Sequence, residues 1–454
     1  MSAGARVEEA LGFLAAHPEV AAVQLLITDP GGVARGKSIG REELEALYHR
    51  GRPVAGSILG LDLRGEDVED TGLVWSAGDA DQVCWPIPGT LQRVPWLERP
   101  TAQLLMSMFD AHGQPVAADP RHALARVVRQ LQADGLHPVV ALELEFFLVE
   151  PDGQGIRPAS GLLTGERMSR HDAYGLGKLE EMTPLFDDLY RAAAIQDLPV
   201  RTLMSEYAPG QFEVTLEHRH DALLAADDAI RWKRLVRGVS ARHGRVATFM
   251  AKPFAEHAGS GMHVHVSLAD AGGRNLFASE DPAGTPLLRH AIGGMAAALP
   301  ESMAIFAPNA NSYRRFRRQS YAPVAATWGV NNRSVGFRIP TGPPESRHVE
   351  HRICGADANP YLAVAAVLAG IHLGIRERLE PGEVVTGNGY ERPLDPALPL
   401  DWHAALERAA SGRLLNESLG DGFVNVFMAI KRAEWDRFHA MPTSLDYDWY
   451  LRLA

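Results

Sequence analysis

Apolar and polar residues alternate with a period of two over several stretches of the first hundred residues, a pattern typical of strands that bury one face. Residues 20–39, VAAVQLLITDPGGVARGKSI, hold two such runs around a Pro-Gly-Gly turn, which predicts a β-hairpin. Similar alternation over Gly72–Ser76 and Asp81–Pro86 predicts further strands, with little helix between them. We therefore expect a small, sheet-rich N-terminal domain.

A helix signal follows the turn-rich stretch FDAHGQPVAAD. Asp119 suits the N-cap, Pro120 the first helical position and Gly135 the position just past the end, and apolar residues recur between them at helical spacing. This pattern predicts a helix. The turn-rich stretch before it indicates a domain boundary, which divides the chain into an N-terminal domain of residues 1–112 and a larger domain of residues 113–454.

Strand and helix patterns then follow one another to the end of the chain. The predicted strands are Val139–Val149, Phe212–Leu216 and Gly261–Leu268, and the predicted helices are Asp221–Gly238 and Asn359–Leu379. The sequence contains no solenoid repeat and no low-complexity segment. We therefore expect an α+β fold for the larger domain, in which several strands carry charged residues on one face.

Composition and charge narrow the class of protein. The 454 residues hold no apolar run near the ~20 residues that span a bilayer, and the first residues form an acidic amphipathic helix pattern without a signal-peptide cleavage region, so we expect a cytoplasmic protein with no membrane contact. Two cysteines cannot build a disulfide framework or a cysteine-based zinc site. The net charge of -11 argues against a general nucleic-acid binder and suits a protein that collects divalent cations.

Carboxylates recur on the predicted strands. Glu143 and Glu145 in LELEFF are two residues apart, so both face one side of a strand while the apolar residues between them face the other. Glu206 and Glu213 bracket an Ala-Pro-Gly turn or bulge that can bring them to one point. A water-exposed strand face could also tolerate such pairs, but apolar flanking residues favour burial. Oxygen-rich clusters of this kind bind Mg²⁺ or Mn²⁺, and two such ions suit a nucleotide's phosphates.

Histidines and arginines extend this chemistry. His263 and His265 alternate along a predicted strand directly after a Gly-Ser-Gly turn, which suits the wall of a site, although half-buried polar histidines are the more ordinary reading of this stretch alone. Arg333 and Arg338 lie in an apolar, glycine-containing context, where a guanidinium needs an anionic partner such as a phosphate or carboxylate. Arg317 fits an ordinary surface position.

Taken together, the motifs LELEFF, SEYAPGQFE, KPFAEHAGSGMHVHVS, NSYRRF, NNRSVGFRIP, HVEHR and ADANPYL make the chain resemble glutamine synthetases of the dodecameric class over nearly its whole length. The resemblance implies a small N-terminal β-grasp domain and a larger catalytic domain with an antiparallel sheet and helices. It also implies a homo-oligomer of two stacked hexameric rings, with active sites between neighbouring subunits. The implied activity is ATP-dependent formation of a γ-glutamyl phosphate that an amine attacks to give an amide.

The resemblance also implies roles for individual residues. It implies two metal sites for Mg²⁺ or Mn²⁺, with Glu145, Glu206 and Glu213 in one and Glu143, His263 and Glu350 in the other. It implies that His265 and Ser267 contact ATP, that Gly259, Arg315 and Arg352 contact the acid substrate, and that Arg333 and Arg338 stabilise the transferring phosphoryl group.

Departures from the family pattern bear on the substrates. Tyr321 stands where ammonium-using members carry a flap glutamate, and Ala55 aligns with an aspartate that binds ammonium. Losing both carboxylates argues against ammonium, while an aromatic face and added space suit an organic amine, so Tyr321 is a candidate substrate-binding residue. Ala258 replaces an asparagine that helps hold glutamate, and Glu345 and His348 replace basic residues near the nucleotide.

Three functions follow from this pattern. The chain is similar to the γ-glutamylpolyamine and γ-glutamylethanolamide synthetase branch, so we expect an ATP- and Mg²⁺-dependent ligase that joins glutamate, or a close analogue, to an organic primary amine such as a polyamine or ethanolamine. The alternatives are a glutamine synthetase that uses ammonium and a catalytically silent structural or regulatory relative. Tyr390 falls where some members are regulated by adenylylation, and we assign it no role.

Overall fold

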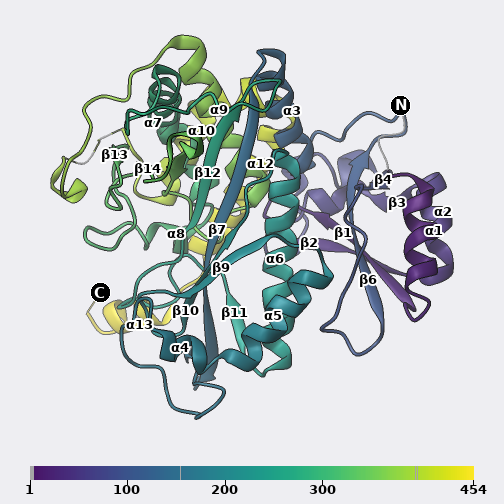
Figure 1. Cartoon of the computed structure of the whole chain (residues 1–454). Coiled ribbons are helices and arrows are strands. Elements are labelled where there is room, and N and C mark those ends of the chain that lie inside the picture. Colours follow the sequence, from purple (N-terminus) through teal and green to yellow (C-terminus); the bar gives the residue numbers. More distant parts are fainter. Residues whose placement is uncertain (1–4, 154, 394, 396, 454) are drawn as a thin grey trace.

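The computed structural model describes residues 5–153, 155–393, 395 and 397–453, and Figure 1 shows its arrangement. The strands are β1 (Ala22–Thr28), β2 (Ala34–Gly40), β3 (Arg52–Ala55), β4 (Asp81–Pro86), β5 (Gln92–Arg93), β6 (Thr101–Phe109), β7 (His137–Asp152), β8 (Gly155–Pro158), β9 (Val200–Ser205), β10 (Gln211–Leu216), β11 (Val246–Thr248), β12 (Met262–Ala269), β13 (Trp328–Val330), β14 (Phe337–Ile339) and β15 (Val349–His351). The helices are α1 (Val7–Ala16), α2 (Leu44–Arg50), α3 (Pro120–Ala133), α4 (Leu176–Glu180), α5 (Thr183–Ile195), α6 (Ala222–Arg242), α7 (Pro286–Phe306), α8 (Ala310–Tyr313), α9 (Pro360–Glu377), α10 (Trp402–Ser411), α11 (Leu414–Leu419), α12 (Asp421–His439) and α13 (Ser444–Tyr450).

The N-terminal sheet has the order β2-β1-β6-β4-β3, with β5 beside β6. The predicted hairpin is confirmed, because β1 and β2 pair antiparallel, and β1 also pairs parallel with the fully buried β6. The strand expected at Gly72–Ser76 is wrong. Single 3₁₀ turns occupy residues 69–71 and 75–77, and each ends at a glycine in the left-handed region, Gly72 (φ 71°) and Gly78 (φ 65°), which breaks the extended chain. The helix α2 also contradicts the expectation of little helix here.

The larger sheet carries the site. Its order is β13-β14-β15-β12-β7-β10-β9, and β8 and β11 also pair with β7. Its pairs are antiparallel except for β13 and β14, which run parallel. Figure 1 shows the long strands β7 and β12 side by side, with α3 and α6 near them. The mixed helix-and-sheet fold that we expected is therefore confirmed, whereas the β-grasp assignment stays a prediction.

The helix predicted after the turn-rich stretch is α3. The Asp119 carboxylate accepts a hydrogen bond from the Arg121 backbone N–H at 2.9 Å, Pro120 occupies the first helical position, and Gly135 has φ 74°. The N-cap bond satisfies a backbone donor that the first helical turn leaves free, and Pro120 supplies the φ that this turn needs. The predicted strands and helices of the larger domain likewise correspond to β7, β10, β12, α6 and α9.

The two parts of the chain share apolar packing. Val426 and Ile430 of the C-terminal helix α12 belong to the core of the N-terminal sheet, whereas Leu26 and Leu105 of that sheet belong to the large core. The boundary between residues 112 and 113 therefore stays a prediction. In the part of the chain that the structure describes, every helix falls short of the length or the apolarity that crossing a membrane requires.

A cavity of about 1250 Å³ lies against α6, α12 and loops of the N-terminal sheet. Its lining includes Lys233, Arg237, Trp96, Phe249 and Phe438. Within the described residues, the carboxylates, histidines and arginines predicted to act on metals and substrates do not line it. The residues that we expect to bind metals and substrates are therefore centred on the larger sheet and not in this cavity.

Candidate active site

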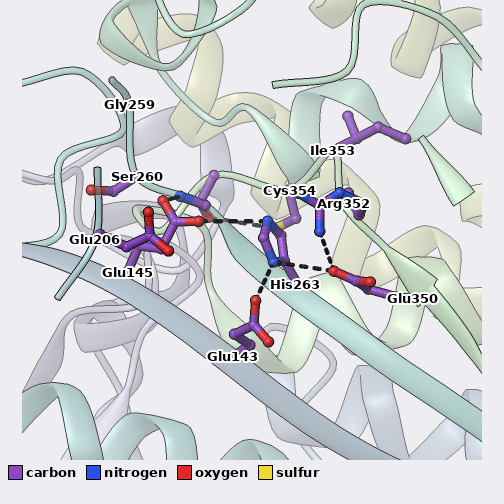
Figure 2. A network of polar contacts seen from close by, with 12 residues as sticks. Glu143, Glu145, Glu206, Gly259, Ser260, His263, Glu350, Arg352, Ile353 and Cys354 are labelled. Atoms are coloured by element: carbon purple, nitrogen blue, oxygen red, sulfur yellow. Dashed lines mark hydrogen bonds and ion pairs between the residues drawn. The ribbon is translucent and has the colours of Figure 1, made fainter. Parts of the chain in front are cut away.

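Strand register brings the predicted ligands together. In β7, Leu142, Leu144 and Phe146 are fully buried on one face, which leaves the alternate positions for carboxylates on the other. The register then sets three pairs directly opposite one another: Glu145 with Glu213, Glu143 with His263, and His265 with Glu350. Cross-strand partners lie about 5 Å apart at Cβ, so four strands converge on one polar patch, which Figure 2 shows in part.

One half of this patch consists mainly of carboxylates, with His263 Nε2 at its edge, 3.7 Å from Glu145 Oε1. Oxygen atoms of Glu145, Glu206 and Glu213 lie within 4.8 Å of one another. Burial, followed by the charge of Glu206, raises the pKa of Glu145 to about 8. Burial, followed by the charges of neighbouring carboxylates, raises the pKa of Glu213 well above its ordinary value. The Gly261 backbone N–H donates to Glu145 at 2.9 Å, but like charges still crowd this half.

The other half contains counter-charge. The His263 Nδ1 atom donates to Glu143 Oε1 at 2.7 Å and lies 3.4 Å from Glu350 Oε1, as Figure 2 shows. Arg338 Nη1 donates to Glu350 Oε2 at 2.7 Å, and Arg352 Nη1 donates to Glu350 Oε1. Burial alone would raise the pKa of both carboxyls. The hydrogen bond from His263, together with nearby His265, instead holds the pKa of Glu143 well below its ordinary value, and Arg352 lowers that of Glu350 to about 2.

The donors of both halves fit divalent cations. Carboxylate oxygens with an occasional imidazole are the ligands that Mg²⁺ and Mn²⁺ prefer. Burial, followed by neighbouring carboxylates, raises the pKa values of the first half, and a bound cation would supply the missing positive charge. A second observation is His265, which is more than nine-tenths buried and whose Nε2 atom, 3.5 Å from Glu143 Oε2, has no hydrogen-bond partner among the described residues. The ligand assignments themselves stay predictions. Ligand atoms of His265 group with those of Glu143 and Glu350, whereas those of His263 group with Glu143 and Glu213.

The ring of His265 is oriented by His348. The His348 Nδ1 atom donates to the Ser346 carbonyl at 2.8 Å, so we assign its Nε2 atom as the acceptor of the His265 Nδ1 hydrogen at 3.1 Å. This chain of hydrogen bonds directs the other nitrogen of His265 toward Glu143. Such a partner fixes the tautomer and the ring orientation of a histidine that binds a metal or a phosphate. Ser267 lies on the same face of β12 as the two histidines.

The remaining arginines are placed differently. Arg315 is buried and donates to the backbone carbonyls of Ile353 at 2.7 Å and Arg352 at 3.2 Å. Arg333 is exposed in the loop between β13 and β14, where its charge lowers the pKa of Glu206 without cancelling the rise that burial causes. Arg338 and Arg352, which were expected to meet substrate, instead both contact Glu350 in this structure.

The Gly-Ser-Gly turn predicted before β12 is wrong. Residues 259–260 run on without a turn, and neither Gly259 nor Gly261 has a positive φ. Both glycines are required for space instead. A Cβ on Gly259 would lie 2.5 Å from the Ala251 carbonyl oxygen, and a Cβ on Gly261 would lie 2.6 Å from Arg315 Nη2. The absence of side chains therefore lets Arg315 pack beneath this segment.

The residues that depart from the family pattern lie in different parts of the structure. Tyr321 is exposed and has φ 58°, in the left-handed region. Ala258 packs against a small apolar cluster. Ala55 lies at the end of β3 opposite Asp81 in the N-terminal sheet, and Glu345 is exposed next to the Ser346 and His348 segment.

Three polar residues of the site were missed by sequence reasoning. Buried Lys178 donates to the carbonyls of Glu206 and Ala208, both at 2.7 Å, and its burial lowers its pKa to about 8. Gln211 Nε2 donates to the Gly259 carbonyl at 3.0 Å, and its position two residues before Glu213 was a signal that it shares that face. His218 follows β10, and its ring centroid lies 5.3 Å from that of His348.

Comparisons with known proteins agree with this geometry. Residues 117–450 match the family model described as glutamine synthetase, catalytic domain. The gamma-glutamylputrescine synthetase of Escherichia coli (strain K12) is 38% identical over 450 residues, covering 98% of this chain and 95% of the relative. The gamma-glutamylethanolamide synthetase of Streptomyces coelicolor is 33% identical over 455 residues, covering 98% and 94%. The solved structure of GmaS in complex with ADP superimposes with a TM-score of 0.84 at 28% identity, covering 97% of this chain and 99% of that one. The resemblance seen in the sequence is thus confirmed, and the chain belongs to the glutamine synthetase family.

Proposed function

We propose that the protein is an ATP-dependent carbon–nitrogen ligase that joins the γ-carboxyl group of glutamate, or of a close analogue, to an organic primary amine such as a polyamine or ethanolamine. The observation that carries the proposal is the complete set of paired carboxylates and histidines on β7, β10, β12 and β15, combined with Tyr321 at the flap position. Relatives that form γ-glutamyl amides from putrescine and ethanolamine support it.

The proposed reaction has two steps. A γ-carboxylate oxygen of the acid attacks the γ-phosphorus of ATP, forming a γ-glutamyl phosphate and releasing ADP. The amine nitrogen, in its uncharged form, then attacks the acyl carbon; phosphate leaves and the nitrogen gives up a proton to solvent as the amide forms. The six predicted ligands would hold divalent cations, which would neutralise charge on the phosphates. The charges of Arg333 and Arg338 would stabilise the transferring phosphoryl group, because guanidinium matches phosphate geometry.

Metal binding and arginine placement are linked in this proposal. Glu350 is one predicted metal ligand, and in this structure it holds both Arg338 and Arg352. A cation on Glu350 would supply the positive charge that the two guanidiniums supply here. The arginines would then be free to turn to anionic substrates, Arg338 to phosphate and Arg352, beside Arg315, to the acid.

Further proposals rest on the family membership. We propose Mg²⁺ or Mn²⁺ as the metal, two or more ions per site, and a dodecamer of two hexameric rings whose N-terminal domain has the β-grasp fold. We also propose that the enzyme works in the cytoplasm, which suits its two buried free cysteines.

A panel of amines tests the function. The purified protein is incubated with ATP, Mg²⁺, glutamate and one amine at a time, with ammonium as one member, and phosphate release is measured. We expect release with polyamines or ethanolamine that exceeds release with ammonium. Equal or greater release with ammonium would instead favour a glutamine synthetase. Absence of Mg²⁺-dependent ATP binding would favour the silent relative.

A further inference from the structure

Four ring side chains from four separate loops gather beside Glu206, and we refer to His171, Tyr207, His257 and Tyr321 as the aromatic rim. The rings of His171 and Tyr207 stack with centroids 4.6 Å apart and planes 21° from parallel. The centroids of Tyr207 and Tyr321 lie 6.3 Å apart, and those of His171 and His257 lie 5.9 Å apart. The rim is therefore a continuous set of rings and not four isolated side chains.

The aromatic rim adjoins the carboxylates that we predict to bind metal. The Tyr207 backbone N–H donates to Glu206 Oε2 at 2.9 Å, so its ring begins one residue from a predicted metal ligand. His257 precedes by two residues Gly259, whose carbonyl accepts a hydrogen bond from Gln211. The rim thus flanks the side of the site that includes Glu206 and the backbone proposed to meet the acid substrate.

Both tyrosine rings of the rim are exposed, and the backbone of Tyr321 is strained. The side chains of Tyr207 and Tyr321 are 42% and 59% exposed. Tyr321 also has φ 58°, a conformation that bulky residues rarely adopt. Exposure of a ring next to an active site forfeits the burial that normally stabilises aromatic side chains. Binding residues often lie on loops that a rigid sheet holds in place. An exposed ring on a strained loop beside the sheet suits such a role.

Acidic residues adjoin three of the four rings in sequence. Asp172 follows His171, Glu206 precedes Tyr207 and Glu256 precedes His257. Asp172 and Glu256 are exposed, as are the two tyrosine rings. The faces of aromatic rings attract cations, and nearby carboxylates strengthen that attraction. This combination selects a positively charged group over a neutral alkyl end.

We propose that the aromatic rim binds the far, cationic end of a diamine substrate, while the other amino group of the same molecule is joined to the acid. The inference rests on the proposed function and specifies its amine: an aliphatic primary amine with a second ammonium group. Tyr207 and Tyr321 determine this specificity through their ring faces. Neither hydroxyl is needed for the contact.

A matched pair of amines tests the proposal in the unmodified enzyme. Butylamine and 1,4-diaminobutane have the same carbon chain and differ in the second ammonium group. Phosphate release is measured against the concentration of each, with saturating ATP, Mg²⁺ and glutamate. We expect a KM for the diamine at least about tenfold lower than for butylamine. Equal KM values would overturn the proposal.

Ring variants locate the effect. Tyr207→Leu and Tyr321→Leu keep apolar volume but lose the ring face, so we expect the KM ratio of the two amines to fall toward one, with KM for ATP and glutamate unchanged. Tyr207→Phe and Tyr321→Phe keep the ring and should preserve the ratio. Tyr190→Leu is the matched control, because Tyr190 is a 45% exposed tyrosine on α5.

The outcomes separate this inference from the proposed function. If the enzyme uses organic amines without preferring the diamine, the proposal for the aromatic rim is wrong and the proposed ligase function stands. If the Leu and Phe variants lose the preference for the diamine equally, the preference depends on the tyrosine hydroxyls. That result would contradict a contact made by the ring faces. Phosphate release with ammonium that equals or exceeds release with the organic amines would contradict the proposed function itself.

Discussion

The two halves of the carboxylate patch differ in how their charge is balanced. Glu145, Glu206 and Glu213 face one another, and all three pKa values are raised. Glu143 and Glu350, on the same sheet, have lowered pKa values, because His263 hydrogen-bonds to Glu143 and two arginines hydrogen-bond to Glu350. Burial and like charges therefore favour the protonated form of the carboxyls in the first half, whereas the surroundings of the second half favour charged carboxylates.

The difference shows what each half requires. If the first half binds a cation as proposed, the cation would replace protons there, so binding would release protons. In the second half, a cation on Glu350 would displace guanidinium groups from that carboxylate. Under this proposal, metal binding is therefore coupled to pH in the first half and to arginine movement in the second.

Removing a ligand of the first half should give the largest effect. We expect Glu213→Ala to lower turnover by at least about 100-fold, because the remaining carboxylates no longer hold a cation in place for the phosphates. Phosphate release with the preferred amine measures it. Glu217→Ala is the matched control, since Glu217 lies exposed just past the end of β10. Near-normal turnover of the Glu213 variant would remove it from the metal site.

Neutralising one carboxylate in each half should change the stability of the metal-free protein in opposite directions. Glu350→Gln leaves Arg338 and Arg352 without their buried partner, and we expect it to lower the free energy of unfolding by about 3 kcal/mol. Glu213→Gln removes one of three crowded carboxyls and should leave that free energy unchanged or raise it at pH 8. Urea unfolding in EDTA measures both. A loss of equal size in both variants would contradict the difference between the halves.

The pH dependence of the metal-free protein should follow the first half. The pKa of Glu145 is about 8 in the folded protein and 4.5 as its ordinary value, so its contribution to stability is complete below pH 4.5 and is lost as pH rises through 8. We expect the Tm in EDTA to fall between pH 6 and pH 8.5. Added Mg²⁺ should raise Tm more at pH 8.5 than at pH 6, and a pH-independent rise would argue against proton displacement.

The smallest expected effect belongs to the flap. Tyr321→Glu introduces the carboxylate that the family resemblance implies for ammonium-using members, so we expect use of ammonium to rise several-fold relative to the preferred amine, with stability little changed. The ratio of kcat/KM for the two nitrogen donors checks it. Tyr321→Gln, which has the same size without the charge, should leave the ratio in favour of the organic amine.

Sequence patterns predicted the carboxylate halves better than their surroundings. Alternation along one strand was enough to place Glu143 and Glu145 on one face, because side-chain direction in a strand is a local property. The opposition of His265 and Glu350 depends on register between distant strands, which one sequence does not determine by local rules. The same limit hid Lys178, which reaches Glu206 from another element.

The structural roles of the glycines were the hardest feature to predict from the sequence. The spacing of Gly259 and Gly261 suggested a turn, whereas their positions are explained by the close approach of Arg315 and the Ala251 carbonyl. At Gly72 the alternating pattern suggested a strand, and the glycine's left-handed conformation ends it. A local pattern does not distinguish a glycine that bends the chain from one that makes room for a neighbour.

A competition between nitrogen donors tests the central claim most directly. Wild-type enzyme receives ATP, Mg²⁺, glutamate, ammonium in tenfold molar excess and 1,4-diaminobutane in one reaction, and mass spectrometry measures the two products. The account predicts that the γ-glutamyl amide of the diamine exceeds glutamine despite the excess of ammonium. Glutamine as the main product would contradict it.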